Sequence, residues 1–329
     1  MKSKSNQVVL DEEIGAIVKM GAELKLGHKI ESMRGLIEQG GFDAVFVGSG
    51  APKGKELNLP GRKEGGANIH IGITWLESVA FDHIKSIGEN VLIIGVGNTA
   101  MDCCRSSLRL GAKSVKVMAR KPRQFFKASE WELEDAEEEN VQIVVNRSPK
   151  NFVVEGGKLK GMTFDVMEYE VDAKGRITSE RMNGEEFFPA DDVILAIGQD
   201  NAFPWIERDL GIEFDKWDMP VVDKTTFMST HPGVFFGGDA AFGPANIIWA
   251  VEHGHQAAIS IHQFCMGMPI TDRPPQGQTL VSTKMGLHEW SYSNYYDPSK
   301  RQKMVHVELP LRFSKMTIEV EEGFTDEQT

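Results

Sequence analysis

Two glycines and an alanine, spaced as Gly95, Gly97 and Ala100, form the clearest chemistry-bearing pattern in the chain. Gly95 permits a tight turn, Gly97 lets the backbone approach a ligand, and Ala100 allows close helix packing. A helix that starts here offers free N–H groups and the positive end of its dipole to phosphates. The pattern predicts a site for the pyrophosphate of a dinucleotide, with Asn98 and Thr99 at its two variable positions. A glycine turn that binds nothing is the alternative.

The residues around this loop supply the elements that must position it. An apolar run at 91–94 is short enough for a buried parallel strand. Residues 101–110 suit a helix that stops at Gly111, and 114–119 suit a second strand. A strand, glycine loop, helix and second strand in this order are the context that a dinucleotide-binding loop requires.

Three cations, Arg120, Lys121 and Arg123, follow the second predicted strand. A site for an unphosphorylated dinucleotide usually has Asp or Glu at this place, where it bonds the ribose hydroxyls. Positive side chains instead attract a 2′-phosphate, which Arg can bind with two hydrogen bonds. The sequence therefore favours NADPH over NADH. A basic turn that only faces solvent is the alternative.

A second strand-to-helix turn resembles a ligand site. A strand predicted at 234–236 runs into a Gly-Gly-Asp sequence, and a predicted helix spans 247–266. The Asp239 carboxylate can accept hydrogen bonds from ribose or ribityl hydroxyls, while the helix start faces the polar edge of a ring. Asp239 as a simple helix cap is the alternative. The expected contacts surround this turn: Gly238, Asp239, Ala245, Asn246 and Ile247.

Length, charge and hydropathy exclude several classes of protein. A chain of 329 residues is too long for one small core and suggests two domains. A net charge of −12 argues against nucleic-acid binding. No apolar run approaches the ~20 residues of a membrane span, and no signal-type apolar segment follows the polar start. These features predict a cytoplasmic protein.

The cysteines give no sign of redox or metal chemistry. Cys103, Cys104 and Cys265 form no C-x-x-C pair, so neither a reactive dithiol nor an iron–sulfur cluster has its usual spacing. Cys103 and Cys104 suit buried, inert positions on the helix after the glycine loop. We expect no metal site.

Periodicity predicts the remaining elements. Helices are expected at 11–19, 33–39, 72–87 and 132–139. Strands are expected at 22–26, 43–47, 141–146, 192–199 and 220–223, and a β-meander at 152–181. The strand at 192–199 carries Gly198 near its end. Beyond Pro269 the pattern weakens: 283–303 is aromatic and polar, and 308–321 reads as extended.

Four motifs in order resemble one family. They are Val47-Gly48-Ser49-Gly50-Ala51, Ile94 to Asp102, Ala196-Ile197-Gly198-Gln199, and Gly237 to Ala240 followed by Ala250 to Gly254. Together they resemble the small subunit of NADPH-dependent glutamate synthase and related flavoprotein oxidoreductases. The resemblance covers nearly the whole chain. It also places residues 126–130 in the nicotinamide site and likens 313–324 to a closing segment of many relatives.

The resemblance implies the fold and the domains. It predicts an α/β protein in which a Rossmann-like NAD(P)-binding domain, 88–201, is inserted into an incomplete FAD-binding α/β domain formed by 1–87 and 202–268. Residues 269–329 form a C-terminal extension. Family members hold the FAD pyrophosphate on an earlier glycine loop, which is missing before Val91 here. We therefore expect only the ribityl and ring half of the FAD site, in a fragment or in a chain that another polypeptide completes.

The leading hypothesis for function is hydride transfer from NADPH, or NADH, to FAD, followed by electron transfer to an iron–sulfur or other redox subunit. The cofactors supply this chemistry, so no catalytic side chain is named. A rival is a non-catalytic NAD(P)-binding or structural subunit of a larger redox complex. A thioredoxin-reductase-like disulfide enzyme is disfavoured by the missing C-x-x-C.

Overall fold

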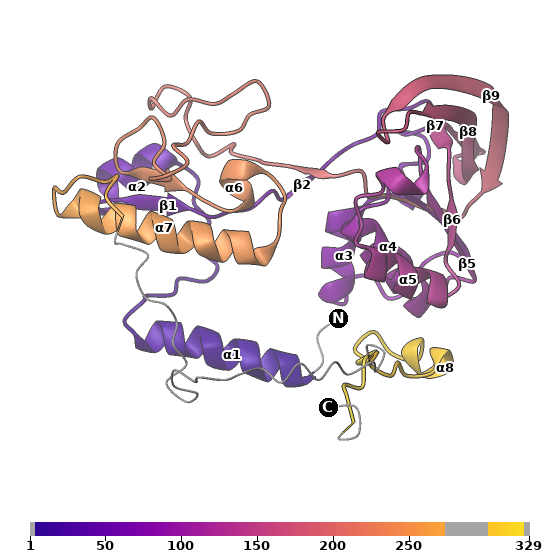
Figure 1. The fold of residues 1–329 in the computed structure, drawn as a ribbon, viewed down its shortest axis with the longest axis horizontal. Helices are drawn as coiled ribbons and strands as arrows, with labels where there is room; N and C mark the ends of the chain where they lie inside the picture. Colours follow the sequence, from indigo (N-terminus) through magenta and orange to yellow (C-terminus); the bar gives the residue numbers. More distant parts are fainter. Residues whose placement is uncertain (1–3, 274–301, 326–329) are drawn as a thin grey trace, which may run out of the picture.

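A computed structural model describes residues 4–273 and 302–325 and divides them into a larger and a smaller body (Figure 1). The larger body is built on a five-stranded, wholly parallel sheet. In spatial order its strands are β3 (Ile69–Ile71), β10 (Asp192–Leu195), β4 (Asn90–Ile94), β5 (Ser114–Met118) and β6 (Gln142–Val144). The parallel strands expected around the glycine loop are confirmed.

Both faces of this sheet are covered, which explains the unbroken apolar run of β4. Val91 and Ile93 face a layer of helices, while Leu92 and Ile94 face an antiparallel sheet. Alternate residues serve opposite faces because the side-chain period of a strand is two. The helices are α3 (Gly72–Ala80), α4 (Asn98–Arg109) and α5 (Glu130–Glu138). The antiparallel sheet consists of β7 (Arg147–Glu155), β8 (Lys158–Val171) and β9 (Ile177–Pro189), which confirms the predicted meander.

The smaller body has a sheet of two parallel strands, β1 (Val45–Val47) and β12 (Val234–Phe236). Its helices are α2 (Met33–Gln39), α6 (Asp239–Phe242) and α7 (Ile247–Cys265). Phe203, Phe236 and Met33 lie in its core. Within the described residues β1 pairs on one side only.

Helix α1 (Lys4–Lys19) carries exposed apolar side chains along its length: Val8, Val9, Leu10, Ile14, Ile17 and Val18.

Short segments complete the fold. A two-stranded antiparallel pair, β2 (Lys53–Gly54) with β11 (Gln199–Asp200), lies between the two bodies (Figure 1). The 3-10 turns η1 (Gly66–Asn68) and η2 (Arg123–Phe125) precede β3 and α5.

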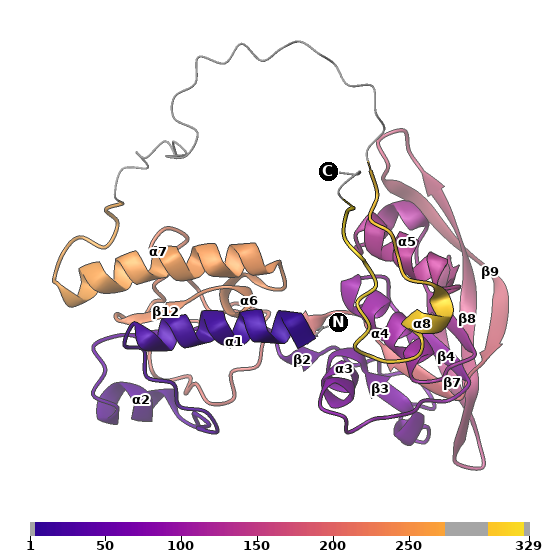
Figure 2. The ribbon, with the colours of Figure 1, turned by 90° about the horizontal axis from the view of Figure 1, so that it is seen from below.

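Residues 302–325, the C-terminal loop, dock on the helix layer of the larger body (Figure 2). The loop contains α8 (Leu309–Arg312), and its two arms are joined by a bridge between His306 and Glu321. The Arg312 side chain is buried and donates to the carbonyl oxygen of Val307 at 2.6 Å. Met316 packs against the core beneath α4 and α5. The C-terminal loop is therefore part of the larger body.

Several predicted elements were wrong. Residues 22–26 form no strand, because Leu24 and Leu26 are exposed and have no neighbouring strand. The helix expected at 72–87 ends at Ala80, since Asp82 adopts a left-handed φ of 59°. Residues 220–223 make only isolated bridges, and 308–321 includes a helical turn. The stretch 283–303 lies almost wholly outside the described residues.

In the described part of the chain, no helix combines the length and the apolar character needed to cross a bilayer.

Candidate functional site

The glycine loop follows β4 at the carboxyl edge of the larger sheet, and its two glycines have different roles. Gly95 has a φ of 123°, and a Cβ there would lie 2.2 Å from the carbonyl oxygen of Ala196. Only glycine fits this close crossing. Gly97 is the N-cap of α4 in an extended conformation, and a Cβ there would meet nothing within 4 Å. The backbone at Gly95 is therefore closely packed against Ala196, while the space in front of Gly97 is open.

The other loop residues lie at the start of α4. Ala100 is fully buried in the core against the sheet, so a larger side chain would push the helix outward. Thr99 and Gly198 line one small cavity, which brings two distant predicted site residues together. Gly198 has a φ of 116°, and its carbonyl oxygen accepts from the Lys55 N–H at 3.0 Å.

The side chain of Asn98 also has a partner within the chain. Its Oδ1 accepts the N–H of Ser129 at 3.1 Å, so this oxygen already has a protein partner. Sequence reasoning treated Asn98 only as a direct ligand of the cofactor. The two residues are 31 positions apart, and no local pattern links them.

The basic segment after β5 divides into free and committed cations. Arg123 binds the carboxylates of Glu130 and Glu137. Across the part of the chain that the structure describes, neither Arg120 nor Lys121 forms an ion pair. The hydroxyl of Tyr169 donates to the Arg120 carbonyl oxygen at 2.8 Å and fixes the backbone there. Two of the three predicted cations thus have no carboxylate partner, and the Lys121 ammonium lies over the Phe125 ring, 5.7 Å from its centroid.

The turn after β12 contains the second set of predicted residues. Gly238 has a φ of 60°, and its N–H donates to Nδ1 of His253 at 3.1 Å. One carboxylate oxygen of Asp239 accepts from the Ala245 N–H at 3.1 Å, so Asp239 closes the turn. Asn246 caps α7 by accepting from the Trp249 N–H at 3.0 Å. Since β1 and β12 are parallel, this turn lies at the same sheet edge as the Gly48-Ser49-Gly50 sequence.

The first turn of α7 is apolar and exposed. Ile247 is 81% exposed, Ile248 78% and Trp249 56%. An apolar surface beside a turn rich in N–H groups suits a flat ring with polar edges. The predicted residues Asp239, Ala245, Asn246 and Ile247 therefore lie together, although Asp239 is partly occupied.

The paired cysteines on α4 are buried thiols. Burial raises the pKa of Cys104 to about 12 and that of Cys103 well above its ordinary value. A thiol with a raised pKa is a poor nucleophile, because the thiolate is the reactive form. Cys265 is exposed at the end of α7.

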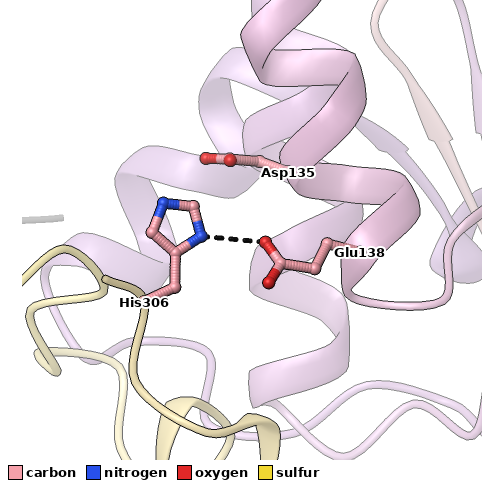
Figure 3. Close-up of side chains that lie close together, drawn as sticks. All are labelled: Asp135, Glu138 and His306. Atoms are coloured by element: carbon pink, nitrogen blue, oxygen red, sulfur yellow. Dashed lines mark hydrogen bonds and ion pairs between the residues drawn. The ribbon is translucent and has the colours of Figure 1, made fainter. Parts of the chain in front are cut away.

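Asp135, Glu138 and His306 form a cluster that the sequence did not reveal (Figure 3). His306 Nδ1 lies 2.8 Å from Glu138, and Arg312 donates to the same carboxylate at 2.9 Å. Arg105 donates to Asp135 at 3.0 Å. A guanidinium already neutralises each carboxylate, so the cluster attaches the C-terminal loop rather than offering a cation site.

Comparisons with known proteins agree on the family. The family model described as "Pyridine nucleotide-disulphide oxidoreductase" matches residues 2–254. A relative named NADP(+)-dependent formate dehydrogenase subunit beta, from Moorella thermoacetica, is 34% identical over 89% of this chain and 40% of its own length. The Glutamate synthase [NADPH] small chain of Azospirillum brasilense is 32% identical over 67% of this chain and 48% of its own. The chain spans about half the length of these curated relatives.

Solved structures support the fold alone. The thioredoxin reductase of T. acidophilum matches with a TM-score of 0.54 and 21% identity, over 68% of this chain and 66% of that one. FprA from Mycobacterium tuberculosis in complex with NADPH matches with a TM-score of 0.54 and 16% identity, over 69% and 64%. Both place the chain in a known class of α/β fold.

Proposed function

The chain belongs to the pyridine nucleotide-disulphide oxidoreductase family, and we propose that it is an NADPH-dependent flavoprotein oxidoreductase that delivers electrons to a partner redox centre. One observation carries the proposal. The open face of Gly97 lies before the N-terminus of α4, and the uncommitted cations Arg120 and Lys121 follow the neighbouring strand. This arrangement suits a pyrophosphate beside a 2′-phosphate.

The proposed NADPH site uses the carboxyl edge of the larger sheet. Gly95, Gly97, Asn98, Thr99 and Ala100 form the pyrophosphate loop. Arg120 and Lys121 hold the 2′-phosphate. Gly198 lines the same small cavity as Thr99. The NAD(P)-binding domain proposed at 88–201 contains this whole set.

The proposed FAD site uses the smaller body, which lies within the FAD-binding domain expected at 1–87 and 202–268. That boundary needs one correction: β3 and α3 pair with and pack on the larger sheet, so residues 69–80 belong to the larger body. Gly238, Asp239 and the first turn of α7 would hold the ribityl chain and the ring. FAD, when bound, would accept hydride from the nicotinamide and pass electrons onward. The fit is partial, because one Asp239 oxygen already closes the turn and no second strand–glycine loop–helix precedes β4 in the described residues.

We assign the FAD pyrophosphate to an additional polypeptide segment that pairs with the free edge of β1. A two-stranded sheet is marginal on its own, and an open strand edge readily accepts another strand. The exposed apolar side chains of α1 and α7 add surface for such a segment. The relatives' names describe subunits or chains of redox enzymes, which supports a redox partner.

The test is a titration of the purified protein with NADPH by calorimetry, followed by reconstitution with FAD. Micromolar NADPH binding, together with a yellow colour that bleaches when NADPH is added, would support the oxidoreductase. Absence of NADPH binding would contradict it.

The incomplete FAD site favours one alternative, an NAD(P)-binding subunit without its own flavin chemistry. Binding of NADPH by a protein that stays colourless after FAD and its partner chains are supplied would favour this alternative.

A further inference from the structure

The segment that follows η2 is tied to the glycine loop at three points. The N–H groups of Lys127 and Ala128 both donate to the Val96 carbonyl oxygen, at 3.1 and 3.0 Å. The N–H of Ser129 donates to Oδ1 of Asn98 at 3.1 Å. One carbonyl and one side chain of the glycine loop therefore hold residues 127–129.

This tie brings two helix N-termini together. Asn98 is the first residue of α4, and Ser129 is the N-cap of α5. Because a hydrogen bond joins them, the positive dipole ends of a 12-residue and a 9-residue helix lie side by side. Such an arrangement doubles the number of free N–H groups next to one anion.

Acidic residues in the first turn of α5 do not cancel this field. Glu130 pairs with Arg123 at 2.8 Å, and Glu132 lies 3.7 Å from Arg105. The first turn of α4 has no acidic residue. The nearest remaining carboxyl is Asp102, one turn into α4, and burial raises its pKa, which favours its neutral form.

A buried hydroxyl marks the same place. Oγ of Ser129 is shielded from solvent and has no hydrogen-bond partner in the described structure. A buried polar group without a partner is costly, so a bound group that accepts its hydrogen would stabilise the junction.

We propose that Asn98 is a positioning residue of the NADPH site, acting through residues 127–129 rather than as a ligand of the cofactor. Its Oδ1 holds the start of α5 against the glycine loop, so that the segment 127–129 forms the second wall of the site. This inference rests on the proposed function. Because the wall faces the part common to both nucleotides, Asn98 affects NADPH and NADH equally, unlike Arg120 and Lys121.

The test compares Asn98→Ala, Asn98→Asp and the matched control Asn183→Ala. Asn183 also makes one side-chain hydrogen bond, to Glu168, but on the distant strand β9. Amide hydrogen exchange of residues 127–129, melting temperature, and affinity for NADPH and NADH are measured for each protein.

Asn98→Ala should speed amide exchange at 127–129. It should also lower the affinity for NADPH and for NADH by a similar factor, about fivefold for the loss of one hydrogen bond. Its melting temperature should stay near that of the parent. Asn98→Asp keeps the acceptor and should keep the slow exchange, while its new charge weakens nucleotide binding. Asn183→Ala should match the parent in every measurement.

Two results would overturn the inference while leaving the proposed function intact. One is unchanged exchange at 127–129 in Asn98→Ala, and the other is faster exchange with full affinity for both nucleotides. A parent protein that binds neither nucleotide would overturn both proposals.

Discussion

Arg120 and Lys121 differ from Arg123 in what surrounds them, and this difference predicts cofactor preference. Replacing Arg120 and Lys121 with Gln should weaken the binding of NADPH by about 1–3 kcal/mol, the scale of charge-assisted hydrogen bonds. The binding of NADH should weaken by less. Arg123→Gln is the control: its guanidinium already binds Glu130 and Glu137, so the preference should remain. Calorimetric affinities for both nucleotides decide the matter, and equal losses would remove the assignment of the 2′-phosphate.

Gly97→Val tests whether the loop is a binding site. The backbone at Gly97 is extended, so Val fits without strain, and its side chain would occupy the open space before α4. Nucleotide binding should be abolished with the fold intact. Gly66→Val is a matched control, because Gly66 also has room for a side chain but precedes β3, at the opposite sheet edge. Normal binding by Gly97→Val, measured by calorimetry, would mean that the loop is only a turn.

Part of the site could be predicted from the sequence because its signal is local. Gly95, Gly97 and Ala100 are fixed by backbone geometry within one turn, and each lies where the pattern requires. The commitment of Arg123 to Glu137 and of Asn98 to Ser129 depends on tertiary proximity. The type of a residue alone does not show whether its side chain has a partner elsewhere in the fold or is available to a ligand.

At the scale of elements, Arg312 holds the C-terminal loop on α5. Its side chain is 2% exposed and donates to Glu138 and to the Val307 carbonyl oxygen. Arg312→Met should lower the free energy of unfolding by about 1–3 kcal/mol, because charged hydrogen bonds are lost from a buried position. The exposed pair of Arg181 with Glu168 provides the control, and Arg181→Met should change stability by less than about 0.5 kcal/mol. Equal thermal stability of Arg312→Met and the parent would contradict the docking role.

The same attachment should weaken in acid. Hydrogen bonds from Arg312 and then His306 lower the pKa of Glu138 from 4.5 to about 2. A lowered pKa means that the contribution is complete above 4.5 and is lost as the pH falls from 4.5 towards 2. Glu138→Gln should flatten this part of the pH dependence of stability, measured by denaturant unfolding at several pH values. A parent and a variant with parallel curves would show that Glu138 does not hold the loop.

Elements were predictable where the sequence pattern and the local surroundings agree. The apolar run of β4 and the alternating first half of β8 identify a buried and a half-buried strand without knowledge of their partners, whereas β9 is mostly exposed. Residues 22–26 have a similar pattern but form no strand, because a strand exists only where another pairs with it. The docking of α8 through Arg312 depends on Glu138, 174 positions away, which the local sequence does not reveal.

For the whole molecule, we expect the chain alone to bind FAD poorly. Asp239 and the start of α7 can contact the ribityl chain and the ring, but no strand–glycine loop–helix unit precedes β4 in the described residues to hold the pyrophosphate. Several charge-assisted hydrogen bonds, each worth roughly 1.5–3 kcal/mol, are then lost. Their sum is comparable to the about 8 kcal/mol of a micromolar complex. Tight stoichiometric binding in a titration of the isolated chain followed by absorbance would show that the flavin site is complete.

The order of strands along the chain also determines the order in which they become available for pairing during synthesis. β1 leaves the ribosome before the larger sheet, yet its partner β12 follows only after that entire sheet, whose last strand is β10, has been made. Since domains fold as units while synthesis proceeds, the larger sheet can assemble as β1 waits with an exposed edge. The C-terminal loop that covers α4 and α5 emerges only after both bodies. A chain whose synthesis stops before residue 302 would therefore contain a larger body whose helices still lack the cover that residues 302–325 provide.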